Sequence, residues 1–254
     1  MGKRNIQDIL HFRRDLPPFL VHLTRERQIN DLLGPTQTIT AKQNLISIFD
    51  SKTLRQSKEH ISSMRFSIDQ NTKKSLGTPM EQFFAAICVT ETPLESIHCL
   101  IEIQGRQVNL EPFGIVFLKG KLKEKNFHPA LYFNNSGRGH LDPIFKAFGK
   151  IVLTDPEEAK EFFPLITTFG HMIGSGSGKH DFYWEREWRR PFCQGDFIFS
   201  LEDDVFCGLC PDEDISFFEG KYEIPFIDPK RPPSWYATKL TKRRKDLKMD
   251  HSVV

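Results

Sequence analysis

The sequence predicts an α+β fold, because strand-like and helix-like segments follow one another along the chain without a regular repeat. Residues 114–118 form a short run of apolar and β-branched side chains, which is typical of a buried strand. Residues 41–49 instead carry Leu45, Ile46 and Phe49 at the spacing of one helical face. A length of 254 residues with 39% hydrophobic side chains suffices for one large domain, or two small ones, with a real core.

The other elements are expected at intervals along the whole chain. Residues 1–15 have the pattern of a short amphipathic helix, which the prolines after it would end. A buried strand over 19–24 leads to a polar turn, and Thr40 or Thr38 is expected to cap the next helix. Residues 151–153 fit either a short strand or part of a longer helix. Further strands are predicted at 83–90, 129–133, 196–199 and 205–207, and further helices at 93–104, 141–148 and 157–163.

The composition is that of an ordinary globular protein, with 27% charged residues. No apolar run is long enough to cross a bilayer. The first residues lack the apolar core of a secretion signal. We therefore expect a cytoplasmic protein with no membrane partner.

The cysteines support the same interpretation. Five is an odd number, which argues against a secreted disulfide framework. Cys207 and Cys210 form a lone C-x-x-C, and a zinc site would need two further ligands from Cys193 or the scattered histidines. We expect buried, reduced thiols and no metal site.

The positive charge is concentrated at the C-terminus. Residues 228–254 contain eight Lys or Arg and three Asp, a local net charge of +5 in a chain whose total is +2. We expect a single domain over 1–227 followed by this basic tail. The tail could contact nucleic acid through phosphates, or it could be a solvated terminal helix or a disordered end.

A nine-residue stretch from Asp181 to Arg189 alternates aromatic and charged side chains, which predicts a strand with two different faces. Glu185 and Glu187 are two apart and would point the same way. Adjacent carboxylates repel each other, so such a pair indicates a nearby cation or a chemical task. Ion pairing with Lys179, Arg186, Arg189 or Arg190 is the structural alternative.

The glycine-rich segment at 173–180 leads into this stretch. It does not match a phosphate-binding loop, because Ile173 stands where the first glycine should be and His180 follows the lysine. It does not match a dinucleotide fingerprint either, because a strand rather than a helix is expected after it. A flexible linker and a substrate-recognition loop both remain open.

Several predicted strands end in polar side chains. His22 and Thr24 close the first strand on one face, Thr90 ends another, and Tyr132 lies near the end of a third. A single histidine is more often structural than functional. Together with the paired glutamates, however, these side chains could line one cleft.

The opening of the chain resembles ADP-ribosyltransferase-like toxins that modify nucleic acids. The resemblance rests on the Leu20-Val-His22-Leu-Thr24 strand and on the following helix with Asn44-Leu45 and Ile48. Four ordered motifs, at 8–15, 88–94, 113–119 and 183–189, more specifically resemble the AbiGi-type abortive-phage-resistance proteins. Together they span residues 8 to 189, most of the chain.

The resemblance implies an ADP-ribosyltransferase-like split β-sheet core with flanking helices and an NAD-binding cleft. Glu187 would be the catalytic glutamate, and Glu185 would orient or deprotonate the acceptor. The residues expected to bind NAD are His22, Thr24, Asn44, Thr90 and Tyr132. The chain departs from the pattern in two respects. Thr90-Glu91-Thr92 would replace a Ser-Thr-Ser strand, and the expected arginine has three candidates, Arg55, Arg65 and Arg106.

We therefore expect an NAD-dependent mono-ADP-ribosyltransferase acting as the toxin of a bacterial anti-phage system. Nucleic acid, RNA or DNA, is favoured over protein as the acceptor, and a neutralising antitoxin is the expected partner. The alternative is a non-enzymatic antitoxin or interaction protein that retains the fold. A nucleic-acid-binding protein that uses the basic tail is a third possibility.

Overall fold

The computed structural model describes residues 16–29, 37–56, 81–103, 109–134, 142–171, 179–180 and 185–249. The predicted N-terminal helix, the loop at 173–178, Tyr183 and Arg65 lie outside these residues, as does Arg106. The chain divides into two compact units. The first comprises residues 1–53, 90–122 and 198–254, and the second comprises residues 54–89 and 123–197.

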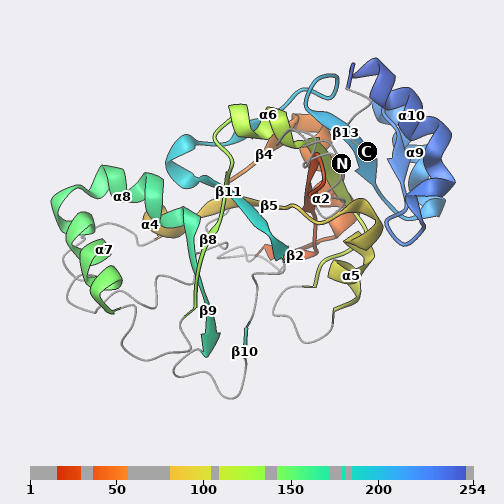
Figure 1. Cartoon of the computed structure of the whole chain (residues 1–254). Helices are drawn as coiled ribbons and strands as arrows, with labels where there is room; N and C mark the ends of the chain where they lie inside the picture. The colour runs from red at the N-terminus through yellow and green to blue at the C-terminus, as the bar shows by residue number, and fades with distance from the viewer. Residues whose placement is uncertain are drawn as a thin grey trace, which may run out of the picture. The chain divides into compact units, whose positions relative to one another are not determined.

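The first unit is built on antiparallel strands (Figure 1). β1 (Phe19–Leu23) pairs over its whole length with β6 (Gly114–Leu118), and Val21 also pairs with Thr90 at the end of β5 (Ala86–Thr90). On the other side of β6 lies β13 (Val205–Leu209), followed by the parallel strand β14 (Phe226–Ile227). The predictions for 19–24, 114–118 and 205–207 are confirmed.

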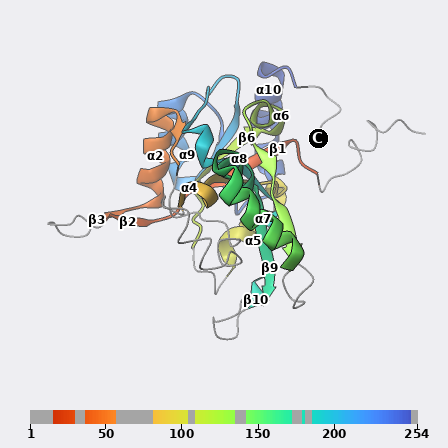
Figure 2. The same cartoon turned by 90° about the vertical axis from the view of Figure 1, so that its left-hand side faces the viewer.

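Helix α2 (Ala41–Ser51) follows β1 and begins at the predicted cap. The Thr40 side chain accepts a hydrogen bond from the Gln43 N–H, and the Gln43 side chain accepts one from the Thr40 N–H. This capping box satisfies two N–H groups that the first helical turn leaves unpaired. α2 packs beside α9 (Ile215–Tyr222), where Lys42 pairs with Asp214 (Figure 2).

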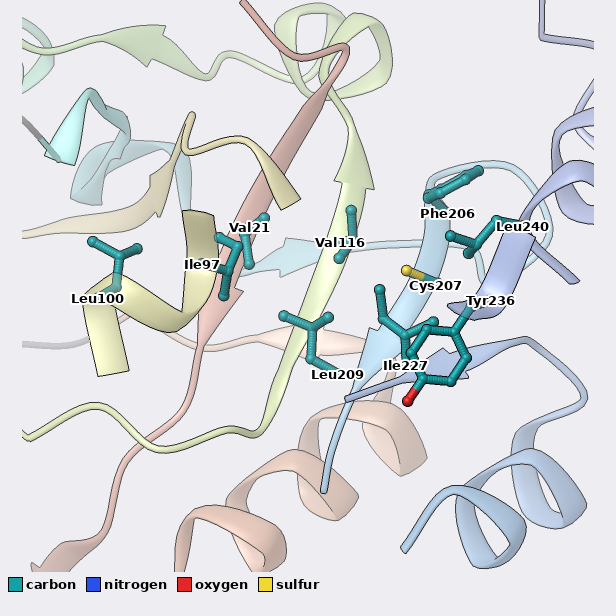
Figure 3. Close-up of a cluster of buried hydrophobic side chains, with 10 residues drawn as sticks. All are labelled: Val21, Ile97, Leu100, Val116, Phe206, Cys207, Leu209, Ile227, Tyr236 and Leu240. Atoms are coloured by element: carbon teal, nitrogen blue, oxygen red, sulfur yellow. The ribbon is translucent and has the colours of Figure 1, made fainter. Parts of the chain in front are cut away.

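The described C-terminal residues, 228–249, pack within this unit and do not form a separate tail. The 3-10 turn η7 (Pro233–Tyr236) leads into α10 (Ala237–Asp246), and Tyr236 and Leu240 are buried. Figure 3 shows both side chains beside Phe206 and Cys207 of β13. Cys207 and Cys210 are buried free thiols, and burial raises the pKa of both.

The second unit has an aromatic core that is formed mainly by helices. α4 (Glu81–Phe84), α7 (Asp142–Thr154) and the 3-10 turn η3 (Phe163–Leu165) that follows α8 (Pro156–Phe162) bring Phe84, Phe148 and Phe163 into contact. Here 83–84 are helical where the sequence suggested strand, and 151–153 extend α7. β8 (Leu131–Asn134), β9 (Ile166–His171) and β10 (Lys179–His180) form a separate sheet, in which β8 and β9 are parallel.

The predicted nine-residue strand is much shorter in the structure. β11 spans Glu187–Pro191 and pairs with β7 (His128–Pro129), while Glu185 lies in a 3-10 turn. Arg186 has a φ of 46°, in the left-handed region, which ends the extended backbone. The expectation that Glu185 and Glu187 share one strand face is therefore wrong. Residues 181–184 lie outside the described part.

The remaining elements are short. They are β2 (Arg27–Ile29), β3 (Gln37–Ile39), β4 (Thr53–Leu54), β12 (Phe197–Ile198), α5 (Ile97–Glu102), α6 (Lys119–Glu124), η2 (Leu94–Ser96), η5 (Phe192–Gln194) and η6 (Asp212–Asp214). The predicted helix at 93–104 is thus a 3-10 turn followed by α5.

The predicted α+β class is confirmed. Hydrogen bonding connects seven strands in the order β14-β13-β6-β1-β5-β11-β7, mostly antiparallel, and β5 contributes residues to both units. Within the described residues, no helix is both long enough and apolar enough to cross a membrane.

Candidate functional site

Glu187 stands at the start of β11 in the second unit. Its backbone is fixed on both sides: the N–H donates to the Tyr132 hydroxyl at 2.9 Å, and the carbonyl accepts from the Ala130 N–H at 2.8 Å. Its side chain is 19% exposed, so the carboxylate is partly accessible to solvent. The two backbone hydrogen bonds hold Glu187 in place where β11 begins.

Arg189 holds the carboxylate from the same face of β11. Its Nη2 and Nε both donate to Glu187 Oε2, at 2.6 Å and 3.0 Å. Its Nη1 donates to the carbonyls of Pro164 (3.0 Å) and Ile166 (3.2 Å). The guanidinium is therefore buried, but each of its three nitrogens donates a hydrogen bond. A buried charge needs such partners to offset the loss of water.

The charge of Glu187 is what makes this burial tolerable. Burial alone would lower the pKa of Arg189, but the negative charge of Glu187 and its hydrogen bonds outweigh it, and the pKa is raised. The guanidinium thus stays protonated at all physiological pH values. Arg189, one of the four cations that the sequence offered as partners for the glutamates, forms an ion pair with Glu187.

Tyr132, on β8, accepts the hydrogen bond from the Glu187 N–H and is close enough to be influenced by the charge of the carboxylate. Burial raises the pKa of its hydroxyl, and the negative charge of Glu187 raises it further. The phenol therefore remains neutral and holds the Glu187 N–H as an acceptor. The sequence grouped Tyr132 with Glu187, and the structure brings these two residues together.

Cys88 of β5 belongs to this group too. Burial raises the pKa of its thiol well above the ordinary value, and the charge of Glu187 contributes in the same direction. A thiol in this environment is a poor nucleophile, so it contributes packing and a weak donor rather than covalent chemistry. Cys88, Tyr132, Glu187 and Arg189 are hereafter called the β11 cluster.

Glu185 is close enough to influence the cluster. Its charge adds to the raised pKa of both Cys88 and Tyr132. It lies one residue before the left-handed Arg186, half-buried in the 3-10 turn. Glu185 therefore approaches the site from a turn and not from the strand that the alternation predicted.

The predicted residues His22 and Thr24 lie in the first unit. His22 is half-buried on β1, opposite Ile115 of β6. Thr24 is buried, and its hydroxyl lies 3.0 Å from the Ala41 carbonyl and 3.1 Å from the Phe113 carbonyl. Thr24 thus ties the end of β1 to the start of α2 and to β6. This arrangement gives no support to a role for the Thr24 hydroxyl in binding NAD.

Asn44 and Thr90 also lie in the first unit. The Asn44 side chain donates to the Arg25 carbonyl at 2.6 Å and so fixes the turn after β1. The Thr90 hydroxyl is 2.8 Å from that of Thr92, and between them Glu91 is buried against Lys119. The Thr90-Glu91-Thr92 segment is therefore an ordered, polar strand end, as the sequence indicated.

Neither the central role of Arg189 nor the participation of Cys88 was predicted from the sequence. Arg189 was one of four cations considered for the glutamates, and the i, i+2 spacing from Glu187 was the signal that distinguished it. Cys88 carried no signal of its own, because an apolar strand with one cysteine is typical of packing. Arg55, one of the three arginine candidates, is exposed in the second unit.

The described residues contain no group of three or more His, Cys, Asp or Glu side chains placed to hold a metal ion. One open hollow lies in the first unit, lined by Glu219, Glu223, Ile224, Pro225, Lys239, Lys242, Arg243 and Asp246. None of the predicted site residues lines it.

Comparison with known proteins gives no further guide to the chemistry: no family model, curated protein or solved structure matches this chain.

Proposed function

We propose that this chain is an NAD-dependent mono-ADP-ribosyltransferase that acts as the toxin of a bacterial anti-phage system. The observation that supports the proposal most is the β11 cluster. It presents a partly accessible carboxylate, Glu187, whose backbone and one oxygen are held by Tyr132 and Arg189. Preorganised charge of this kind is what a reaction that develops positive charge requires.

The proposed reaction breaks the bond between the nicotinamide nitrogen and C1′ of the ribose. The bonding electrons leave with nicotinamide, and positive charge develops on the ribose. The Glu187 carboxylate would stabilise that charge and bind the ribose hydroxyl beside it. A nucleophilic oxygen or nitrogen of the acceptor then bonds to C1′, and its proton passes to Glu185 acting as general base.

The second unit carries the residues that fit the reacting end of NAD. Tyr132 supplies an aromatic side chain whose hydroxyl is bound to the Glu187 backbone, and Glu185 supplies a second carboxylate from a neighbouring turn. His22 and Thr90, to which the resemblance also assigns NAD contacts, lie in the first unit, and the proposal for Glu187 does not depend on them. Thr24 and Asn44, also in the first unit, hold the backbone around β1.

The acceptor in this proposal is nucleic acid, RNA or DNA, and the protein would need a neutralising antitoxin. Both follow from the toxin-like opening of the sequence and from its basic C-terminal residues. The cytoplasm, where NAD, nucleic acid and an antitoxin are all present, is the proposed location.

The first test is growth after induced expression in bacteria, with the native chain compared with Glu187→Gln at matched expression. Gln keeps the size of the side chain and removes its charge. We expect the native chain to arrest growth and the variant to permit it. Equal toxicity of both chains would contradict the assignment of Glu187.

A second candidate function is supported by one specific observation. Because Glu187 is paired with the buried Arg189, the carboxylate has a structural task that needs no substrate. A non-enzymatic antitoxin or interaction protein that retains this fold would keep the pair for stability alone. In that case neither the native chain nor Glu187→Gln would arrest growth.

A further inference from the structure

Helix α10 has two chemically different faces. On the inner face Leu240 packs on the core that contains Phe206 and Cys207, beside Tyr236 of the preceding turn η7 (Figure 3). Leu247, just after the helix, packs against the same core. Arg243 also points inward, where it donates to backbone carbonyls of Leu201, Val205 and Phe206. Lys239 is likewise engaged, with Glu219 and the Phe226 carbonyl. These two cations hold the fold and are not available to a ligand.

The outer face carries a different set. Thr238, Lys242 and Lys245 are exposed, and Lys248 is exposed just beyond the helix end. Trp235, on η7, comes three residues before Thr238, and Lys242 and Lys245 follow at spacings of four and three. Within α10 these spacings place Thr238, Lys242 and Lys245 along one side of the helix, and Trp235 lies in the turn just before its first residue.

Trp235 is the most informative member of this set. It is 67% exposed, although a large aromatic side chain normally gains by burial. The Arg231 guanidinium lies over its ring, 4.5 Å from the centroid, and Arg231 also pairs with Asp212 at 3.1 Å. The indole is thus supported on one side by a fixed cation and otherwise faces solvent.

We propose that Trp235 and the outer face of α10 form a binding surface for single-stranded nucleic acid. An exposed indole offers a stacking platform for one base, and the Lys242, Lys245 and Lys248 ammonium groups would pair with successive phosphates. From Trp235 to Lys245 the surface extends roughly 15 Å, which is the length of about four nucleotides.

Other occupants fit this surface less well. A duplex keeps its bases stacked and would leave the indole without a partner. A membrane-binding helix needs a broad apolar face, and the described residues on this side include only one large apolar side chain, Trp235. The hollow beside α10 is lined by three carboxylates, those of Glu219, Glu223 and Asp246, and by the three cations Lys239, Lys242 and Arg243, so its charges balance and it offers a phosphate no net attraction.

The test is fluorescence anisotropy with the full chain and labelled 20-mers of dT and of rU. The two oligonucleotides distinguish DNA from RNA. We expect binding at low salt that weakens with salt, with a logarithmic slope of about −2 for three phosphate contacts. Trp235→Ala should weaken binding about ten-fold, whereas Trp235→Phe should retain most of it, because stacking contributes strongly per base.

Matched controls separate this surface from general charge effects. The double variant Lys242→Glu/Lys245→Glu should abolish most of the binding and flatten the salt slope. The double variant Lys146→Glu/Lys150→Glu makes the same charge change at exposed positions of α7 and should bind as the native chain does. All substituted side chains are exposed, so each variant should unfold at the same temperature as the native chain. Thermal unfolding therefore serves as the control for folding.

The proposal would be overturned by absence of binding to both oligonucleotides, by equal loss in the α7 control, or by native binding of Trp235→Ala. Binding of the protein to vesicles of anionic lipid but not to the oligonucleotides would overturn it too. It does not rest on the proposed transferase activity. Glu187→Gln should bind both oligonucleotides like the native chain, whether or not NAD is consumed.

Discussion

The Glu187 carboxylate and the Arg189 guanidinium face each other across one intervening residue of β11, with Arg189 Nη2 2.6 Å and Nε 3.0 Å from Glu187 Oε2. On a strand, residues two apart lie on the same face, so the pair requires no special loop. The burial of Arg189 makes the two side chains one electrostatic unit. A change to either should therefore affect the other.

Arg189→Met tests the structural side of this pair. It leaves Glu187 without its cation and the Pro164 and Ile166 carbonyls without a donor. We expect the free energy of unfolding to fall by about 3–5 kcal/mol, measured by urea denaturation.

The double variant Glu187→Gln/Arg189→Met is the control for coupling. Because it removes both charges together, it should be less destabilised than the sum of the two single variants. Additive losses would show that the two side chains do not interact in solution.

Tyr132→Phe tests the contact between the phenol and β11. Loss of the hydrogen bond from the Glu187 N–H should cost about 1 kcal/mol at neutral pH. The pKa of Tyr132 is raised by burial and by the charge of Glu187, whereas an unfolded tyrosine titrates near about pH 10. The folded chain therefore keeps a proton that the unfolded chain loses.

It follows that the contribution of Tyr132 is fully present below about pH 10 and is lost as the pH rises toward its folded pKa. Thermal unfolding of the native chain and Tyr132→Phe, measured at pH 8 and at higher pH, checks this. The native chain should lose more stability than the variant over that interval. An identical alkaline loss in both would exclude Tyr132 as the group responsible.

Gly208→Ala tests the packing of β13 against β14. A Cβ at position 208 would come within 2.0 Å of the Phe226 ring. We expect a loss of about 1–3 kcal/mol or more in the free energy of unfolding, because the buried ring cannot move aside without cost. The matched control is Gly220→Ala on α9, where a Cβ meets nothing within 4 Å.

Alanine at 220 should stabilise the chain by about 0.5–1 kcal/mol, since glycine is unfavourable within a helix. Unfolding of both variants in guanidinium chloride should show a lower free energy of unfolding for Gly208→Ala and a higher one for Gly220→Ala. Equal behaviour of the two variants would contradict the described contact between Gly208 and Phe226.

Leu240→Ala tests whether α10 belongs to the core. The side chain is 9% exposed and packs in the cluster with Ile227 and Tyr236. Its truncation should cost about 2–5 kcal/mol, whereas Lys242→Ala on the exposed face should be close to neutral. If Leu240→Ala were also neutral by differential scanning calorimetry, residues 228–249 would be the appended tail that their composition suggested.

Local patterns predicted the elements whose signal was local. The helix cap, expected at Thr40 or Thr38 and found at Thr40, and the apolar run of β6 both depend on near neighbours in sequence, and both are confirmed. The alternation over 181–189 predicted too long a strand, because period-two spacing cannot reveal that Arg186 adopts a left-handed backbone. The basic charge of α10 likewise concealed the buried stripe of Tyr236 and Leu240 beneath it.

The site could be predicted only in part, for a related reason. Tyr132 and Glu187 were both named from sequence, but their contact depends on two strands that lie far apart in the chain. The tasks of Thr24 and Asn44 could not be foreseen, because a threonine or asparagine after a strand suits a ligand contact and a backbone tie equally well. Only the hydrogen-bond partners distinguish these two roles.

The most direct test of the central claim uses purified protein, NAD labelled in its adenylate, and separate samples of bacterial RNA, DNA and protein. Because Glu187→Gln leaves Arg189 without its charged partner, the variant must first be shown to be folded, and Glu187→Asp provides a second variant that retains the charge. The proposed function predicts that the native chain transfers label to nucleic acid and releases nicotinamide, and that folded Glu187→Gln does neither. Transfer by Glu187→Gln at the native rate, or no nicotinamide release by the native chain with any acceptor, would contradict it.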